Sequence, residues 1–142
     1  MSFSLSDKLY ANKPYEETVP ILGRKITFRV LSGQEESEIA RRCGASSIIE
    51  LIQTKRIPTL ARAITAIDDA GWKEADEIKQ LLHSNPEWSL VEAVESELRK
   101  SKYTDDVLGV LFAGYNDIRE KYRSELSKLK NDLNQPSPES VG

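Results

Sequence analysis

The sequence is short of the residues that most enzymes and metal sites need. Among its 142 residues there is one cysteine, Cys43, and one histidine, His83. One cysteine cannot form an internal disulfide, and these two side chains would need two carboxylates to complete a zinc site. A nucleophile with a histidine base would have to use His83, and the sequence contains no glycine-rich phosphate loop. We therefore predict a protein that is not an enzyme and that has no cofactor and no metal.

Ordinary structural roles account for the few candidate catalytic side chains. Asp68 and Asp69 are adjacent carboxylates, but a magnesium site would need a third ligand and a phosphate-bearing substrate. A solvated turn is the simpler interpretation. His83 ends a short predicted helix, where its charge suits the helix dipole, and Cys43 is expected to be a small core residue.

The chain also lacks a charge excess and a long apolar run. Lysine and arginine number 20 against 23 aspartate and glutamate, for a net charge of −3. Mixed charge of this kind provides no basic face for nucleic acid. No run approaches the ~18 apolar residues of a membrane span, and residues 1–13 have neither the apolar run nor the basic cluster of a signal peptide. We expect a cytoplasmic protein without membrane contact.

What the sequence does contain is one long amphipathic helix, predicted from Asp105 to about Leu133. Its apolar residues recur at spacings of three and four over roughly seven turns, which is one face of an α-helix. Thr104 can cap this helix, and Asp105 and Asp106 suit the positive end of its dipole. The stripe comprises Leu108, Leu111, Tyr115, Ile118, Tyr122, Leu126, Leu129 and Leu133.

The two halves of this stripe differ. From Leu108 to Ile118 it is apolar enough to be core, whereas from Tyr122 to Leu133 single apolar residues alternate with charges, as along a coiled-coil seam. The distal half either packs within the chain or projects and docks on another protein, and the sequence leaves both open. Gly109 and Gly114 each weaken the helix by roughly 1 kcal/mol relative to alanine, which predicts that another helix packs very close to the proximal half.

Upstream of this helix, the pattern predicts a β-hairpin and several shorter helices. Tyr15–Val19 and Lys25–Leu31 are rich in β-branched and aromatic residues and form the hairpin. Capping-box sequences at Ser32–Glu35 and Ser89–Glu92 begin two of the helices. Another helix starts near Ser46 or Ser47.

Pro58 either kinks that helix or begins another at its first position. The pattern favours two abutting helices, the second continuing through Ile64 and Ile67. Asp68–Gly71 is predicted to be a turn and Lys73–His83 a short helix. The predicted fold class is mainly α with a short N-terminal β-hairpin, an α+β fold dominated by five to six helices. Residues 1–14 form an extended arm, residues 15–134 a single domain, and residues 135–142 a disordered tail.

The segment Val19–Arg29 (VPILGRKITFR), followed by a glutamate-rich helix opened at Ser32, resembles the start of small helical proteins encoded among tailed-phage tail genes. These are the baseplate-hub assembly chaperones of contractile-tailed phages and the related tail-assembly chaperones. The Ile57–Leu60 segment, the Ile67-Asp68 turn and a long last helix with Tyr115 in its middle add to the resemblance. It covers roughly Val19 to Leu133.

The resemblance implies a non-enzymatic role in which the protein binds other tail or baseplate-hub components. It would act as an assembly chaperone in the host cytoplasm or as a minor structural part of the virion tail or baseplate. A helical regulatory or nucleic-acid-binding adaptor domain is the alternative. The long helix could also pair with a second copy of the chain. The residues expected to make protein contacts are Tyr122, Leu126, Leu129 and Leu133 on the long helix, and Phe3 and Leu5 on the arm.

Overall fold

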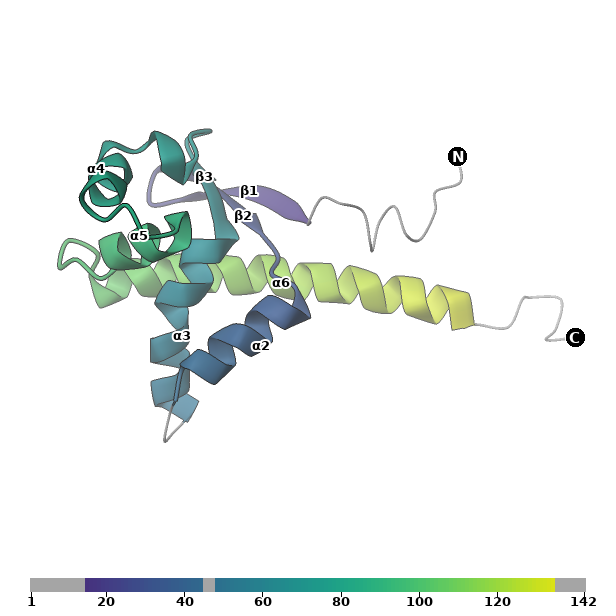
Figure 1. Ribbon diagram of the computed structural model, residues 1–142. Helices are drawn as coiled ribbons and strands as arrows, with labels where there is room; N and C mark the ends of the chain where they lie inside the picture. The colour runs from purple at the N-terminus through teal and green to yellow at the C-terminus, as the bar shows by residue number, and fades with distance from the viewer. Residues whose placement is uncertain (1–14, 45–47, 135–142) are drawn as a thin grey trace, which may run out of the picture.

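The computed structural model describes the backbone of residues 15–44 and 48–134, and the side chains of residues 15–44 and 54–132. Within these ranges the chain forms a three-stranded antiparallel sheet, one short 3-10 helix and five α-helices, the last of which is long. The predicted fold class, helix-dominated with an N-terminal hairpin, is therefore confirmed. Figure 1 shows the longest helix, α6 (Asp105–Asn134), running past the other elements and out beyond them.

The predicted hairpin consists of β1 (Glu16–Ile21) and β2 (Arg24–Arg29), which pair in register from Glu16↔Arg29 to Ile21↔Arg24. The two turn residues, Leu22 and Gly23, have φ values of 53° and 76°. Two positive φ values in a two-residue turn match the right-handed twist of the strands. In β2, Ile26 and Phe28 are buried on one face, as their alternation with polar residues predicts.

A third strand, β3 (Ile64–Ile67), corrects the expectation that the helical pattern continues through Ile64 and Ile67. It pairs antiparallel with β2, with an irregularity between Thr27 and Phe28. Isoleucines three residues apart fit either a helix or a short strand, so periodicity cannot assign the secondary structure of a segment of only four residues. The open edge of β2 favours a strand here, because the backbone N–H and C=O groups along that edge need hydrogen-bond partners.

Pro58 does not divide the second helical segment. After α2 (Gly33–Arg42), α3 runs as one helix over Ile48–Ala63 with Pro58 inside it, so the two abutting helices expected from the sequence are wrong. A proline leaves the carbonyl four residues earlier without its helical N–H donor. That carbonyl belongs to Thr54, and it accepts a hydrogen bond from Cys43 Sγ at 3.5 Å, which compensates part of this loss.

The next segment is divided more finely than predicted. A 3-10 helix, η1 (Trp72–Glu74), precedes α4 (Asp76–Ser84), because Ala75 between them is extended. Helix α5 covers Leu90–Leu98 and begins with the predicted capping box, in which Ser89 Oγ accepts from the Glu92 N–H and the Glu92 carboxylate from the Ser89 N–H. The Thr104 cap is also confirmed, since its hydroxyl accepts from the Val107 N–H at 3.3 Å.

The proximal half of the α6 stripe is core, as predicted: Leu108, Leu111, Tyr115 and Ile118 are buried. They join a cluster contributed by β2, α2, α3, α4 and α5, which includes Phe28, Ile39, Leu60, Ile78 and Leu98. The expectation that a helix packs very close to both glycines is wrong at Gly114. A Cβ added there would lie 2.5 Å from Ile21 Cδ1, on strand β1. At Gly109 it would lie 3.6 Å from Arg56 Nη1 of α3, an ordinary contact distance.

Candidate interaction surfaces

The distal end of α6 extends past the sheet and past α2 (Figure 1). Among the predicted contact residues, Tyr122, Leu126 and Leu129 are half-buried and share the face that the core residues of α6 occupy. Leu133 lies in the same helix, but its side chain is outside the described residues. Phe3 and Leu5 of the predicted arm are also outside them. The structure thus brings three of the six predicted residues together on one helix face.

Strand β1 meets the stripe at Tyr122. The rings of Tyr15 and Tyr122 lie 5.1 Å apart between centroids and are tilted by 40°. Beside them, Lys121 Nζ donates to Glu17 Oε1 at 2.8 Å. Burial raises the pKa of Tyr15, and the nearby carboxylates of Glu125 and Glu17 raise it further. These contacts hold the helix to the sheet at the point where the helix leaves the core.

The first turn of α2 also stabilises the place where α6 packs against the sheet. Ser32 and Glu35 form the predicted capping box, and Glu35 also accepts two hydrogen bonds from Arg29 of β2, at 2.9 and 2.7 Å. The Arg29 guanidinium lowers the pKa of Glu35 to about 2, more than offsetting the cost of burial. The next residue, Glu36, accepts two hydrogen bonds from Arg119 of α6. Adjacent glutamates therefore connect α2 to the sheet and to the long helix.

The middle of α6 is tied to the end of β2 by a buried hydrogen bond. The backbone N–H of Leu31 donates to the Tyr115 hydroxyl oxygen at 3.2 Å, across 84 residues of sequence. Burial raises the pKa of Tyr115, although the bond from Leu31 acts in the opposite direction. Because the bond is buried, it sets the position of α6 along its axis as well as adding stability. The distal end is thereby presented at a defined place.

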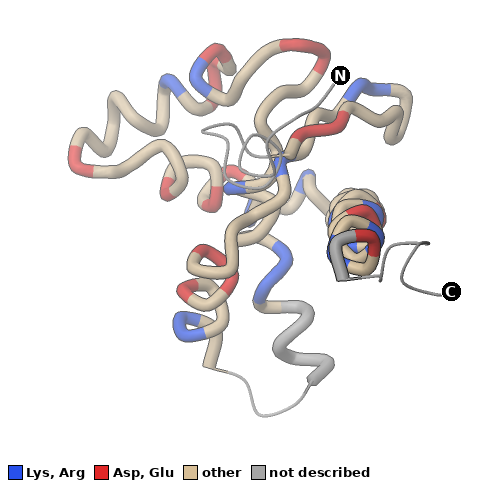
Figure 2. Tube along the Cα trace, turned by 90° about the vertical axis from the view of Figure 1, so that its right-hand side faces the viewer, with Lys and Arg blue, Asp and Glu red and all other residues tan. Residues whose placement is uncertain are grey.

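Figure 2 views the molecule with the tip of α6 towards the reader, and both signs of charge appear on this tip and on the other elements. By helical spacing, Arg123 and Lys130 lie along one edge of the distal stripe. The other edge is mixed, with Glu125, Asp132, Lys121 and Lys128. The projecting helix therefore has an apolar line with a cationic edge and an edge of mixed charge.

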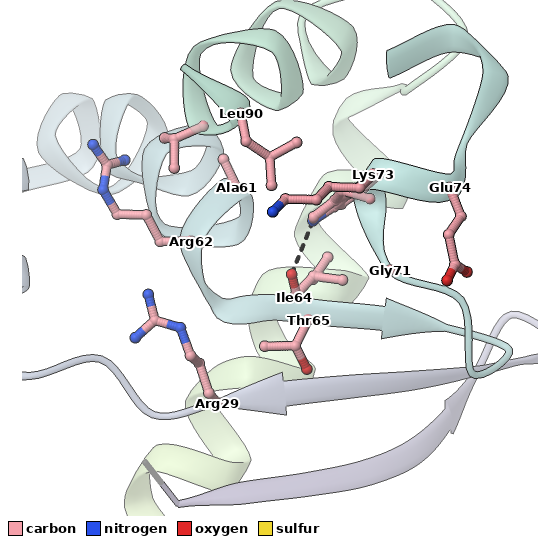
Figure 3. Close-up of a pocket in the computed structure, with 11 residues that line it drawn as sticks. Arg29, Ala61, Arg62, Ile64, Thr65, Gly71, Lys73, Glu74 and Leu90 are labelled. Carbon is pink, nitrogen blue, oxygen red and sulfur yellow. Dashed lines mark hydrogen bonds between the residues drawn. The ribbon is translucent and has the colours of Figure 1, made fainter. Parts of the chain in front are cut away.

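A second candidate surface is a cavity of about 440 Å³ beside β3. Its lining is formed by the start of α5, the end of α3, η1 and the strands β2 and β3, and Figure 3 shows the side chains around it. Trp72 is held in the wall because its Nε1–H donates to the Ile64 carbonyl at 2.8 Å. Arg29, Arg62 and Lys73 also line the cavity. No pattern in the sequence indicated it, because its residues come from five separate elements.

Buried carboxylates lie on α5, away from the predicted contact residues. Glu95 is 3% exposed and has Arg42, Arg62 and Arg99 within 3.5 Å of its oxygens. Glu97 is 1% exposed and pairs with Lys100 and Lys102. Burial opposes its ionisation, but the two lysines outweigh it, so the pKa of Glu97 lies below its usual range. Both carboxylates have structural partners that account for their burial.

The acidic pair has a structural role in the turn. Asp68 Oδ1 accepts from the Lys25 N–H at 2.9 Å and Oδ2 from Arg24 at 3.0 Å, and these bonds lower the pKa of Asp68. Both Asp68 and Asp69 have positive φ, as expected of turn residues. Within residues 15–44 and 48–134, no three His, Cys, Asp or Glu side chains are arranged to hold a metal ion. In the same ranges, no helix is long and apolar enough to cross a membrane.

Comparisons of the chain with protein-family models, with curated proteins and with solved structures find no match.

Proposed function

We propose that this protein is a non-enzymatic component of a tailed-phage tail or baseplate, which binds other tail or baseplate-hub proteins through the distal end of α6. The observation that carries the proposal is the continuation of the apolar stripe beyond the core. Tyr115 and Ile118 are buried within the domain, and Tyr122, Leu126 and Leu129 extend the same face past it. The sequence resemblance supports tail or baseplate-hub proteins as the partners.

The stripe favours a different protein over a second copy of the chain. In a parallel pair, the partner helix would run back along Tyr115 and Ile118, where this chain's own core already lies. In an antiparallel pair, like edges face each other, which brings Arg123 and Lys130 of one copy against the same residues of the other. A helix of another protein with acidic residues opposite Arg123 and Lys130 avoids both problems.

The test is co-purification of the tagged full chain with candidate tail and baseplate-hub proteins expressed together with it. We expect one of them to co-purify with the native chain and to be lost with Leu126→Asp plus Leu129→Asp, since two carboxylates on the apolar line oppose burial. The matched control is Ser124→Asp plus Ser127→Asp, which adds the same charge to the exposed face of the same turns. We expect this control to retain the partner.

Circular dichroism melting of both variants checks that the domain remains folded. Retention of the partner by the leucine variant would show that the distal stripe is not the contact surface. Light scattering on the native chain gives a second check, for which we expect a monomer. A dimer that the leucine variant abolishes would instead assign the stripe to self-association.

A further inference from the structure

The cavity beside β3 is a separate site that the proposed function does not use. Its volume, about 440 Å³, lies within the range of about 300–1,000 Å³ typical of ligand pockets. Ile64, Trp72, Leu90 and Val91 provide apolar walls. The hydrogen bond from Trp72 Nε1–H to the Ile64 carbonyl holds the indole in place, so this wall is formed before any ligand arrives.

The polar side chains that line the cavity are mainly cationic. In Figure 3, Arg29 and Arg62 stand on one side and Lys73 extends its ammonium group towards them from the other, while Glu74 points away. Arg29 is paired with Glu35 and Arg62 with Glu95. No carboxylate of the described residues lies within ion-pair distance of Lys73. The lining therefore includes one uncompensated positive charge, on Lys73, and two guanidinium groups on the other side that are fixed by their partners.

The first turn of α5 adds to this positive potential. Leu90 and Val91 are the first two residues of this nine-residue helix, and both line the cavity. The positive end of a helix dipole favours a negative group within about one turn. One anionic group, accompanied by an apolar group that fills the remaining space, matches the charge and the walls of this cavity.

We propose that the cavity binds the C-terminal residue of a partner polypeptide. Its apolar side chain would pack against Trp72 and Leu90, and its α-carboxylate would lie against Lys73 with Arg29 and Arg62 nearby. A chain terminus is the smallest protein group that carries a carboxylate and an apolar side chain on one carbon, so both enter one cavity together. An internal acidic residue is continued by polypeptide on both sides, and both of these segments would also have to fit at the opening of the cavity. Capture of terminal carboxylates is a known mode of peptide recognition.

The test titrates the full chain with N-acetyl-leucine and, separately, with N-acetyl-leucinamide. Binding is monitored through the indole N–H resonances of the tryptophans in nitrogen-15 NMR spectra. The chain has two tryptophans, Trp72 and Trp88, and Trp72→Phe identifies the reporter signal. We expect saturable shifts of the Trp72 signal with the free acid, which should bind up to about fivefold more tightly than the amide. Lys73→Gln should reduce the affinity for the acid towards that for the amide, while Arg29, Arg62 and the α5 dipole keep a smaller preference.

The matched control is Lys79→Gln, which removes an exposed lysine of α4 outside the cavity and should leave binding unchanged. Equal binding of acid and amide, or an unaltered affinity in Lys73→Gln, would overturn the proposal. Equally tight binding of N-acetyl-glutamyl-leucinamide would overturn the choice of a chain terminus. Leu126→Asp plus Leu129→Asp should bind N-acetyl-leucine normally, so the outcome is independent of the α6 contact.

Discussion

Arg119 of α6 and Glu36 of α2 form a two-point ion pair across 83 residues of sequence: Nε and Nη2 donate to the two carboxylate oxygens at 2.5 and 2.9 Å. The side chains are 22% and 28% exposed. Planar, bidentate and partly buried pairs are stronger than most surface ion pairs. This pair lies one turn before Tyr122, where α6 leaves the core, so it helps to set the direction of the projecting end.

Replacing Arg119 should measurably weaken the domain. We expect Arg119→Gln to lower the free energy of unfolding by about 1–2 kcal/mol, because Glu36 loses both of its hydrogen bonds from Arg119. Urea denaturation measures the change. Glu36→Gln and the double variant complete a cycle, and a coupling energy near zero would contradict the contribution assigned to the pair. Arg123→Gln is the control, since Arg123 is 53% exposed and only 4.0 Å from Glu36, and should cost less than about 0.5 kcal/mol.

The Arg29–Glu35 pair predicts a specific loss of stability in acid. The pKa of Glu35 is about 2 in the folded chain against an ordinary value of 4.5, so the folded state holds the ionised form more strongly. This contribution is fully present above pH 4.5 and is lost as the pH falls from 4.5 to 2. Since the pair is partly exposed to solvent, we expect about 1 kcal/mol, measured by urea denaturation across this pH range.

Glu35→Gln should remove this part of the pH dependence and should keep the capping box, because glutamine also caps at that position. Glu38→Gln, an exposed change on the same helix, should leave the native acid profile in place. Parallel acid profiles for the native chain and Glu35→Gln would show that Glu35 does not contribute.

Tyr115→Phe tests the buried bond between α6 and the end of β2. Phenylalanine keeps the ring, which lies 6.2 Å from that of Phe28, but leaves the buried Leu31 N–H without its acceptor. We expect a loss of about 1–2 kcal/mol in thermal or urea unfolding. Tyr122→Phe retains the ring contact with Tyr15 and should change stability by less than about 0.5 kcal/mol. Equal effects of the two substitutions would argue against a special role for the Tyr115 hydroxyl.

Gly114 and Ile21 should be coupled. Alanine in a helix is about 1 kcal/mol better than glycine, but a Cβ at Gly114 would lie 2.5 Å from Ile21 Cδ1. We expect Gly114→Ala to be neutral or destabilising in the native chain, and to stabilise an Ile21→Val chain by up to about 1 kcal/mol, because valine lacks Cδ1. Gly109→Ala, which meets only an ordinary contact, should stabilise either background. The same effect of Gly114→Ala in both backgrounds would contradict the proposed clash.

Interactions between near neighbours were predictable from the sequence. The capping boxes at Ser32 and Ser89 and the cap at Thr104 each depend on residues three apart, and all are present. The alternation in β2 and the proximal stripe of α6 were also predictable, since one face of each element must be buried. For the same reason the helix-dominated fold class could be predicted.

Interactions between distant segments were decided by the tertiary structure. The Thr54 carbonyl, which Pro58 leaves without a helical donor, accepts a hydrogen bond from Cys43. Strand β3 forms because the edge of β2 is open to it. The closest neighbour of Gly114 is Ile21, and the cavity combines residues from five elements.

The type of most elements, their caps and the face that each buries therefore follow from the amino-acid sequence. These properties depend on contacts within about one helical turn or along one strand. Four other features arise from packing in three dimensions. They are the continuity of α3 through Pro58, the third strand, the point where α6 leaves the core, and the cavity with Lys73 opposite two arginines. Each of these depends on groups that are far apart in sequence and that meet only after the chain has folded.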